Sequence, residues 1–227
     1  MRLLAIETAT ESCSAALLVD GAVTARERLA PREHAALILG MCEELLAGAG
    51  LRPADLDAVA FGRGPGSFTG VRVATGVIQG IAFAAELPVA PVSSLAALAQ
   101  GAYRQDGAEM ILTAIDARMG EVYWGAYEVD RGLVRPMRDD AVVAPEQVSC
   151  PEEGEWFGVG TGWGTYREVL AQRVAGRLSG IEAERYPLAQ DVARLAAPML
   201  EQGETVPAER ALPVYLRDNV ANKPKTQ

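Results

Sequence analysis

The stretch FGRGPGSFTGVRVATGVIQGIAFAA, from Phe61 to Ala85, constrains the fold more than any other part of this sequence. The apolar residues that end at Phe61 read as a strand, and the turn GRGPG at 62–66 breaks that strand, because glycine supplies positive φ and proline fixes the next turn. Ser67 or Thr69 is then placed to cap a helix that runs to about Glu86.

The predicted helix is apolar nearly all round, which is typical of a buried helix. After Arg72 its only long polar side chain is Gln79. Gly76, Gly80 and Ala84 recur at intervals of four and share one face, so another backbone can approach that face closely. We therefore expect both faces to be covered, and a broad apolar helix predicted at 34–46 is the nearest candidate within the chain.

The two halves of the chain follow one plan of three strands, a helix or loop, a strand and a helix. In the first half we predict strands at 3–6, 13–19, just after the turn at 20–21, 57–61 and 88–92, with a last helix from Ser93 or Ser94 to Tyr103. In the second half we predict strands at 110–115, 121–129, a third ending near 143, and 156–159, with helices at 165–174 and 188–202.

The sequence therefore predicts a two-lobed α/β fold with mixed sheets flanked by helices, divided into residues 1–104 and 105–227 at a polar segment. The second lobe ends in a tail that becomes polar after Leu216 and is expected to fray. This plan resembles the architecture of the actin, hexokinase and Hsp70 (ASKHA) ATPase superfamily.

The charge balance argues against tight, direct binding of nucleic acid by this chain. The formal net charge is −9, and the only lysines are Lys223 and Lys225 in the tail, so a phosphate-cradling P-loop with its lysine is absent. No apolar run free of charge and turn formers reaches the length of a membrane span, and Glu7 interrupts the first apolar stretch too early for a signal peptide. We expect a cytoplasmic protein.

Four blocks, in order along nearly the whole chain, carry a resemblance to a family. They are LAIETA from Leu4, GPGSFTGVR from Gly64, IDARMGEVY from Ile115 and PVYLR from Pro213. Together they resemble the bacterial TsaB (YeaZ) family. The resemblance implies a subunit of the machinery that makes threonylcarbamoyladenosine (t6A) in tRNA, in which a paralogue, TsaD, does the catalytic work and a P-loop ATPase, TsaE, joins the complex.

The residues agree with a chain that is not itself the catalyst. The paralogue is expected to bind a metal through paired histidines, and the positions here that match them are Ser94 and Leu98. His34 is the only histidine in the sequence, so a site of several histidines is impossible by count. We expect no catalytic residue, no metal and no intrinsic cofactor, with ATP or ADP at most at an interface of the complex.

Nucleotide binding stays open as an alternative, in which the chain is an active ATPase or phosphotransferase of the superfamily. Its candidate residues are Glu7 in the first hairpin, Asp116 in the second, and Gly160 and Gly162 in GVGTGWG. Ala9 stands where a phosphate-binding hairpin of this type wants glycine. For Gly160 and Gly162 we favour a tight strand-to-helix turn, and for Asp116 a turn cap.

We also predict a partner surface on the two apolar helices. The family resemblance implies that these helices pair with their counterparts in TsaD, or with a second copy of this chain when TsaD is absent, while tRNA is bound indirectly through the complex. The residues expected to shape or line this surface are Leu37, Ile38, Met41, Gly64, Pro65, Gly66, Ser67, Phe68, Gly76, Val77, Ile78, Gly80 and Ile81.

Overall fold

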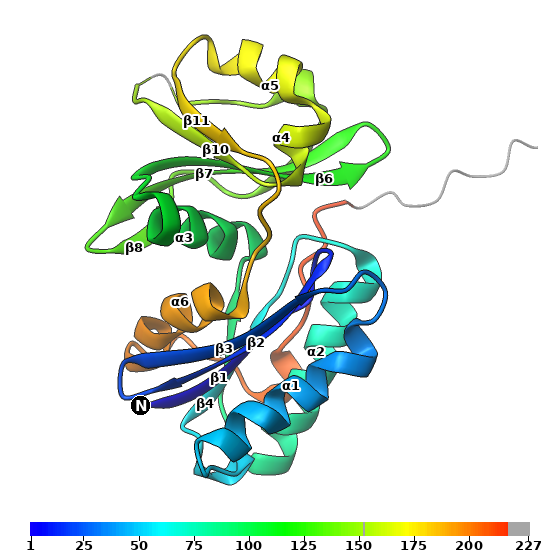
Figure 1. Ribbon diagram of the computed structural model, residues 1–227, viewed down its shortest axis with the longest axis vertical. Coiled ribbons are helices and arrows are strands. Elements are labelled where there is room, and N and C mark those ends of the chain that lie inside the picture. Colours follow the sequence, from blue (N-terminus) through cyan, green and yellow to red (C-terminus); the bar gives the residue numbers. More distant parts are fainter. Residues whose placement is uncertain (152, 218–227) are drawn as a thin grey trace, which may run out of the picture.

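The computed structural model describes residues 1–151 and 153–217, and it has two lobes that are each built on one sheet (Figure 1). The first sheet has the strand order β3-β2-β1-β4-β5. Its first three strands are antiparallel, and β4 and β5 continue it in parallel with β1. The strands are β1 (Arg2–Glu7), β2 (Ser12–Val19), β3 (Ala22–Leu29), β4 (Ala58–Gly62) and β5 (Val89–Val92).

The second sheet repeats this topology, with the order β11-β10-β6-β7-β8 and with β9 also paired to β7. Again three antiparallel strands are followed by two parallel ones. The strands are β6 (Met110–Arg118), β7 (Glu121–Asp130), β8 (Leu133–Pro136), β9 (Ala141–Val143), β10 (Trp156–Val159) and β11 (Leu178–Glu182). The predicted two-lobed α/β fold with mixed sheets is confirmed.

Six α-helices and three short 3-10 turns lie in the described part of the chain. The helices are α1 (His34–Gly48), α2 (Phe68–Ala85), α3 (Ser94–Asp106), α4 (Thr161–Thr165), α5 (Arg167–Val174) and α6 (Ala189–Glu201). The 3-10 turns are η1 (Pro53–Asp55), η2 (Pro145–Gln147) and η3 (Ala208–Arg210).

The middle of strand β1, from Leu3 to Ile6, is apolar because helices cover both faces of the first sheet. Leu4 and Ile6 point into a core shared with α1 and α2. Leu3 and Ala5 point to the opposite face, into a core shared with α6. All four side chains are fully buried, and successive residues of a strand alternate between faces.

Helices α3 and α6 each pack on the sheet of the other half of the chain, which differs from the predicted division between residues 104 and 105. Most of helix α3 precedes that division, which cuts its last turn, yet its Leu95 and Leu98 pack on the second sheet against Ile111 and Tyr127. Helix α6 follows the division, yet it covers the first sheet (Figure 1). The prediction of lobes made of residues 1–104 and 105–227 was wrong for these helices, because both are apolar and sequence distance does not show which sheet each one covers.

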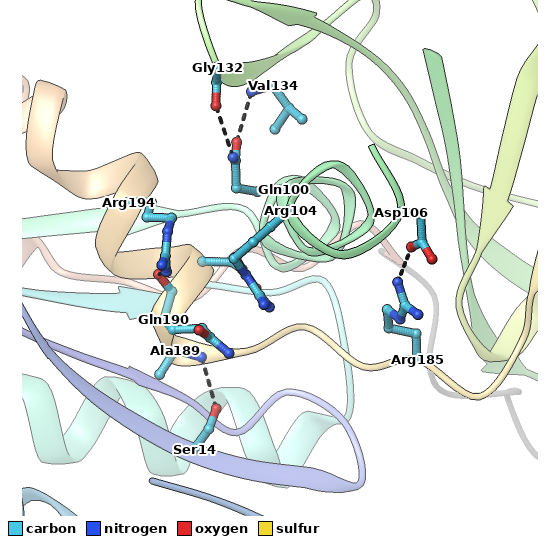
Figure 2. A network of polar contacts seen from close by, with 11 residues as sticks. Ser14, Gln100, Arg104, Asp106, Gly132, Val134, Arg185, Ala189, Gln190 and Arg194 are labelled. Atoms are coloured by element: carbon cyan, nitrogen blue, oxygen red, sulfur yellow. Dashed lines mark hydrogen bonds and ion pairs between the residues drawn. The ribbon is translucent and has the colours of Figure 1, made fainter. Parts of the chain in front are cut away.

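Polar contacts hold the exchanged helices together. Arg104 on α3 donates two hydrogen bonds to the buried carboxylate of Asp191 on α6, at 2.8 and 2.9 Å. At the start of α6 the amide of Ala189 donates to Ser14 Oγ of β2 at 2.9 Å, and Arg185 pairs with Asp106 (Figure 2). These contacts therefore fix both ends of the segment from Arg185 to Ala189, which connects the second lobe to the first.

Three local predictions for the second lobe were incomplete. The predicted third strand is two strands, β8 and β9, and the helix predicted at 165–174 begins earlier, as α4 followed by α5. Strand β11 was missed because its glycine and serine do not read as a strand. Gly180 leaves room for the ring of Phe157, since a Cβ atom at this position would lie 2.8 Å from it. The predicted fraying of the tail beyond Arg217 concerns residues outside the described part.

Helix α2 closely follows the prediction. The Ser67 hydroxyl caps it by accepting the amide of Gly70 at 3.1 Å, and it ends at Glu86 in a left-handed conformation. Helix α2, with 18 residues and a mean hydropathy of 1.3, is long and apolar enough to cross a membrane by length and composition only, although it contains Arg72 and three glycines. Core helices of soluble proteins pass the same test, and α2 packs its buried side on the first sheet.

Removing one side of the α3–α6 ion pair tests the exchange of helices. We expect Arg104→Met to lower the free energy of unfolding by about 3 kcal/mol, because Asp191 is left buried with an uncompensated charge. The measurement is urea unfolding followed by circular dichroism. The matched control is Arg135→Met, which removes the exposed pair with Asp130 and should cost less than about 1 kcal/mol. Equal losses in the two variants would contradict the role of this pair.

Candidate functional site

A cavity of about 720 Å³ lies between the two lobes. From the first lobe it is lined by the hairpin between β1 and β2, the approach to α1 and the start of α2, and from the second lobe by the hairpin between β6 and β7 and by α4. Its lining residues are Ala9, Thr10, Glu11, Pro31, Arg32, His34, Gly66, Ser67, Phe68, Ile115, Asp116, Ala117, Arg118, Tyr123, Thr161, Thr165, Tyr186, Val214, Tyr215, Leu216 and Arg217.

Asp116 lies in the cavity wall and is engaged by its own hairpin. Its carboxylate accepts the amide of Arg118 at 2.8 Å and the guanidinium of the same residue at 3.2 Å, while its amide donates to Thr161 Oγ1 at 3.1 Å. Arg118 also reaches Glu11 across the cavity at 3.4 Å. Asp116 thus orders the turn and holds an arginine that links the lobes.

Glu7 does not line the cavity, although it was a candidate for a nucleotide site. Its side chain is fully buried, where it accepts the amide of Ala9 at 2.6 Å and the hydroxyl of Ser94 at 2.7 Å. Gly62 makes room for it, since a Cβ atom there would lie 1.7 Å from Oε2 of Glu7. Burial raises the pKa of Glu7 to about 7, against the opposing effect of the hydrogen bond from Ser94. The geometry makes Glu7 a link between the first hairpin and α3.

Gly160 and Gly162 are also set back from the cavity. A Cβ atom at Gly160 would lie 2.5 Å from the carbonyl oxygen of Ala114, and one at Gly162 would lie 2.8 Å from the Cβ of the same alanine. Gly160 has φ +107, which favours glycine. Both glycines therefore allow α4 to approach β6 closely.

The last described residues cross from one lobe to the other and form part of the cavity wall. The amide of Val214 donates to the carbonyl of Arg63 at 2.8 Å, and Tyr215 OH accepts from Arg72 at 2.8 Å. Arg217 pairs with Glu121 of the second hairpin and donates to the carbonyl of Ala117 at 3.1 Å. The PVYLR block thus ties the start of α2 to the second lobe.

Several cavity residues were missed by reasoning from the sequence, chiefly Thr10, Arg32 and His34. His34 begins α1 as predicted, and its side chain is buried in the wall of the cavity. The signal that could have found it is the position of a lone histidine at the start of a helix, directly after an arginine-containing turn. Among the described residues, no group of three or more histidine, cysteine, aspartate or glutamate side chains could hold a metal ion.

A second, apolar depression runs along the outer face of α2. We call it the α2 groove, and it is lined by Leu39, Pro53, Gly76, Val77, Gly80, Ile81 and Ala84. Cβ atoms added at Gly76 or Gly80 would meet no atom within 4 Å. The small-residue face that was expected to be covered by α1 is therefore open, and Leu39 of α1 only borders it.

The residues predicted for a partner surface separate into three groups. Gly76, Val77, Gly80 and Ile81 lie in the α2 groove, and Leu37 and Met41 are half-buried on α1. Ile38 and Ile78 were placed wrongly, because both are fully buried against the first sheet. The turn before α2 faces the other site, since Gly66, Ser67 and Phe68 line the interlobe cavity, and Gly64 and Pro65 are buried.

The burial of Glu7 predicts a specific pH dependence of stability. The folded pKa of Glu7, about 7, exceeds the ordinary value of 4.5. Its contribution to the free energy of unfolding is therefore fully present below pH 4.5 and is lost as the pH rises through about 7. In the wild type, the free energy of unfolding should fall by up to about 3 kcal/mol between these pH values because of Glu7. The variant Glu7→Gln is uncharged at every pH, so we expect this fall to be absent from it. Chemical denaturation at a series of pH values measures it. If the free energy of unfolding changed with pH in the same way in the wild type and in Glu7→Gln, the assignment would be ruled out. The control is Glu109→Gln, at an exposed carboxylate, which should behave as the wild type does.

Comparison with known proteins gives the relationships of this chain. A family model described as "TsaD: tRNA N6-adenosine threonylcarbamoyltransferase" matches residues 24–225. The tRNA threonylcarbamoyladenosine biosynthesis protein TsaB of Escherichia coli is 47% identical over 98% of this chain and 97% of its own length. The TsaB protein of Haemophilus influenzae is 42% identical, over 98% of this chain and 96% of its own.

A solved structure has the same fold over nearly its whole length. YeaZ from Pseudomonas aeruginosa superposes with a TM-score of 0.90 at 50% sequence identity, covering 95% of this chain and 99% of that one. The four sequence blocks noted above, the repeated sheet topology and these relatives agree. The chain belongs to the TsaB (YeaZ) family.

Proposed function

We propose that this chain is a non-catalytic scaffold of the t6A modification machinery, and that its α2 groove binds the catalytic paralogue TsaD. The observation that carries the proposal is the open groove itself, in which Gly76 and Gly80 leave space for the backbone or side chains of another helix. The role in t6A biosynthesis rests on the names of the relatives, TsaB, and on the match to the TsaD family model.

The surroundings of the groove support a protein partner. Leu39 of α1, which lines the groove, is 50% exposed, and Phe83 on the same helix as the groove glycines is 81% exposed, so α1 and α2 both offer apolar surface to a partner. The relation to the TsaD family model favours a partner with similar helices, because related chains can present matching helix faces to each other. The same groove then serves for a homodimer when TsaD is absent.

The remaining members of the complex follow from this proposal. With a net charge of −9, the chain contacts tRNA only through its partners, and TsaE joins the assembled complex in the cytoplasm. The chain holds no cofactor of its own, and ATP or ADP belongs to an interface of the complex. Its function is to keep TsaD in a competent form.

A substitution in the groove tests the scaffold proposal. We expect Gly80→Arg to weaken association with TsaD by about tenfold or more, because a charged side chain then fills the α2 groove. The folded chain should be no less stable, since replacing an exposed glycine inside a helix gains up to about 1 kcal/mol. Size-exclusion chromatography with light scattering, of the chain alone and with TsaD, measures both the heterodimer and the homodimer.

The matched control is Gly164→Arg, at an exposed glycine on α4 of the second lobe. Unchanged association of Gly80→Arg with TsaD would refute the assignment of the groove. Turnover of ATP at enzymatic rates by the purified chain alone would refute the non-catalytic role. Ile78→Glu is unsuitable for this test, because Ile78 belongs to the core and its replacement would unfold the first lobe.

A further inference from the structure

The rim of the interlobe cavity carries large apolar side chains that are exposed to solvent. Phe68, Leu212 and Met119 are each more than half exposed, and Tyr215 is 45% exposed. Phe68 and Tyr215 line the cavity, and Met119 joins them through Arg217, whose Nη1 lies 3.6 Å from the Met119 sulfur. Apolar surface is therefore gathered where α2, the last described residues and the second hairpin meet.

Arg72 is held in a fixed orientation within this group. The carbon of its guanidinium lies 3.5 Å from the centroid of the Phe68 ring, and its Nε donates to Tyr215 OH at 2.8 Å. The two rings are themselves 5.9 Å apart. An exposed arginine usually has many rotamers and loses that freedom when it binds a partner. Arg72 has already lost much of it in the free chain, so its guanidinium is preorganised for a ligand.

The charge of Arg72 is not neutralised within the part of the chain that the structure describes. No carboxylate of those residues forms an ion pair with it, whereas the nearby Arg118 and Arg217 both have acidic partners. Its Nε is engaged, and neither Nη has a hydrogen bond among the described residues. Two Nη atoms can donate side by side to both oxygens of one carboxylate.

The tip of the second hairpin holds Met119 outward through an unusual backbone. Arg118, Met119 and Gly120 have φ values of +62°, +58° and +79°, a conformation that the first two residues rarely adopt. The Asp116 carboxylate, which accepts the amide of Arg118 at 2.8 Å, and Arg217, which donates to its carbonyl at 3.3 Å, hold this turn. Strain that the surroundings maintain is typical of functional sites. Here it presents an apolar side chain that buries little surface within the chain.

These features favour a protein partner over a nucleic acid. Protein interfaces are enriched in aromatic residues, methionine and arginine, which are the side chains gathered here. Leu212 and Met119 offer apolar surface that a sugar-phosphate backbone does not match, and the net charge of −9 repels a polyanion. The complement of apolar side chains around one unpaired guanidinium is a carboxylate flanked by apolar side chains.

We propose that Phe68, Arg72, Met119, Leu212 and Tyr215 form a docking surface, the Arg72 surface, for a segment of a partner protein that carries a carboxylate between apolar side chains. Arg72 binds the carboxylate, and the four apolar residues pack around it. The Arg72 surface shares no residue with the lining of the α2 groove, so it does not depend on which protein the groove binds.

Met119 provides the probe, because the methyl group of a ¹³C-labelled methionine gives a sharp NMR signal that Met119→Leu assigns. The full chain is titrated with the peptide acetyl-Leu-Asp-Phe-amide and with its neutral match, acetyl-Leu-Asn-Phe-amide, at constant pH and ionic strength. We expect a saturable shift of the Met119 signal with the aspartate peptide. The asparagine peptide should bind about tenfold more weakly, since it cannot form the charge-assisted pair with Arg72.

Two variants test the role of the guanidinium. Arg72→Gln should bind both peptides with equal affinity, because the preference for aspartate comes from the charge. Leu212→Asp keeps the bond between Arg72 and Tyr215, and it should weaken the aspartate peptide more than the asparagine peptide, because it adds a negative charge to the surface. The matched control is Arg28→Gln, at an exposed arginine of β3, which should retain the tenfold preference.

Purified TsaD and TsaE, the partners in the proposed function, are then added separately to the labelled chain. The protein that carries the segment should shift the Met119 signal, and it should bind Arg72→Gln about tenfold more weakly than the wild type. Gly80 lies outside the Arg72 surface, so the Gly80→Arg experiment tests the scaffold proposal separately.

Four results would overturn the proposal of the Arg72 surface. They are the absence of a saturable Met119 shift with the aspartate peptide, equal affinities of the wild type for the two peptides, the same response of Arg72→Gln and Arg28→Gln, and a Met119 signal that neither protein shifts, whether or not tRNA does.

Discussion

The ion pair between Arg104 and Asp191 joins the two helices on which the two-lobed structure depends. Helix α3 comes from the first half of the chain and covers the second sheet, whereas α6 comes from the second half and covers the first sheet. The carboxylate of Asp191 is 1% exposed, and the guanidinium that neutralises it lies on the other helix. Each sheet therefore has one inner face buried by a helix from the other half, and the two lobes share their interior.

This shared interior determines where a ligand or partner can bind. The inner faces of both sheets are filled by α3 and α6, so the remaining sites are the hairpin ends, where the interlobe cavity opens, and the outer side of α2, where the groove lies. The cavity is bordered by links between the lobes, the Glu11–Arg118 pair and the segment from Val214 to Arg217. The groove is on the first lobe alone and remains available whatever the cavity holds.

Much of the fold could be predicted from the sequence because local signals were strong. The glycine turn, the Ser67 cap and the apolar length of α2 gave its bounds closely, and the duplicated strand pattern gave both sheets. The sequence could not show which face of α2 packs on the first sheet. Because the helix is apolar all round, either Ile78 or Val77 could have met the sheet. The candidate site was predicted less well, since Thr10, Arg32 and His34 belong to no motif and only the folded chain brings them together.

The late position of α6 in the sequence has a consequence for how the protein is made. On the ribosome, the five strands of the first sheet are complete once β5 has emerged, but the side of β1 that carries Leu3 and Ala5 stays uncovered until residues 189–201 follow. The nascent first lobe is thus an aggregation-prone intermediate for about half of the time needed for synthesis. Its stable packing is achieved only when translation is nearly finished.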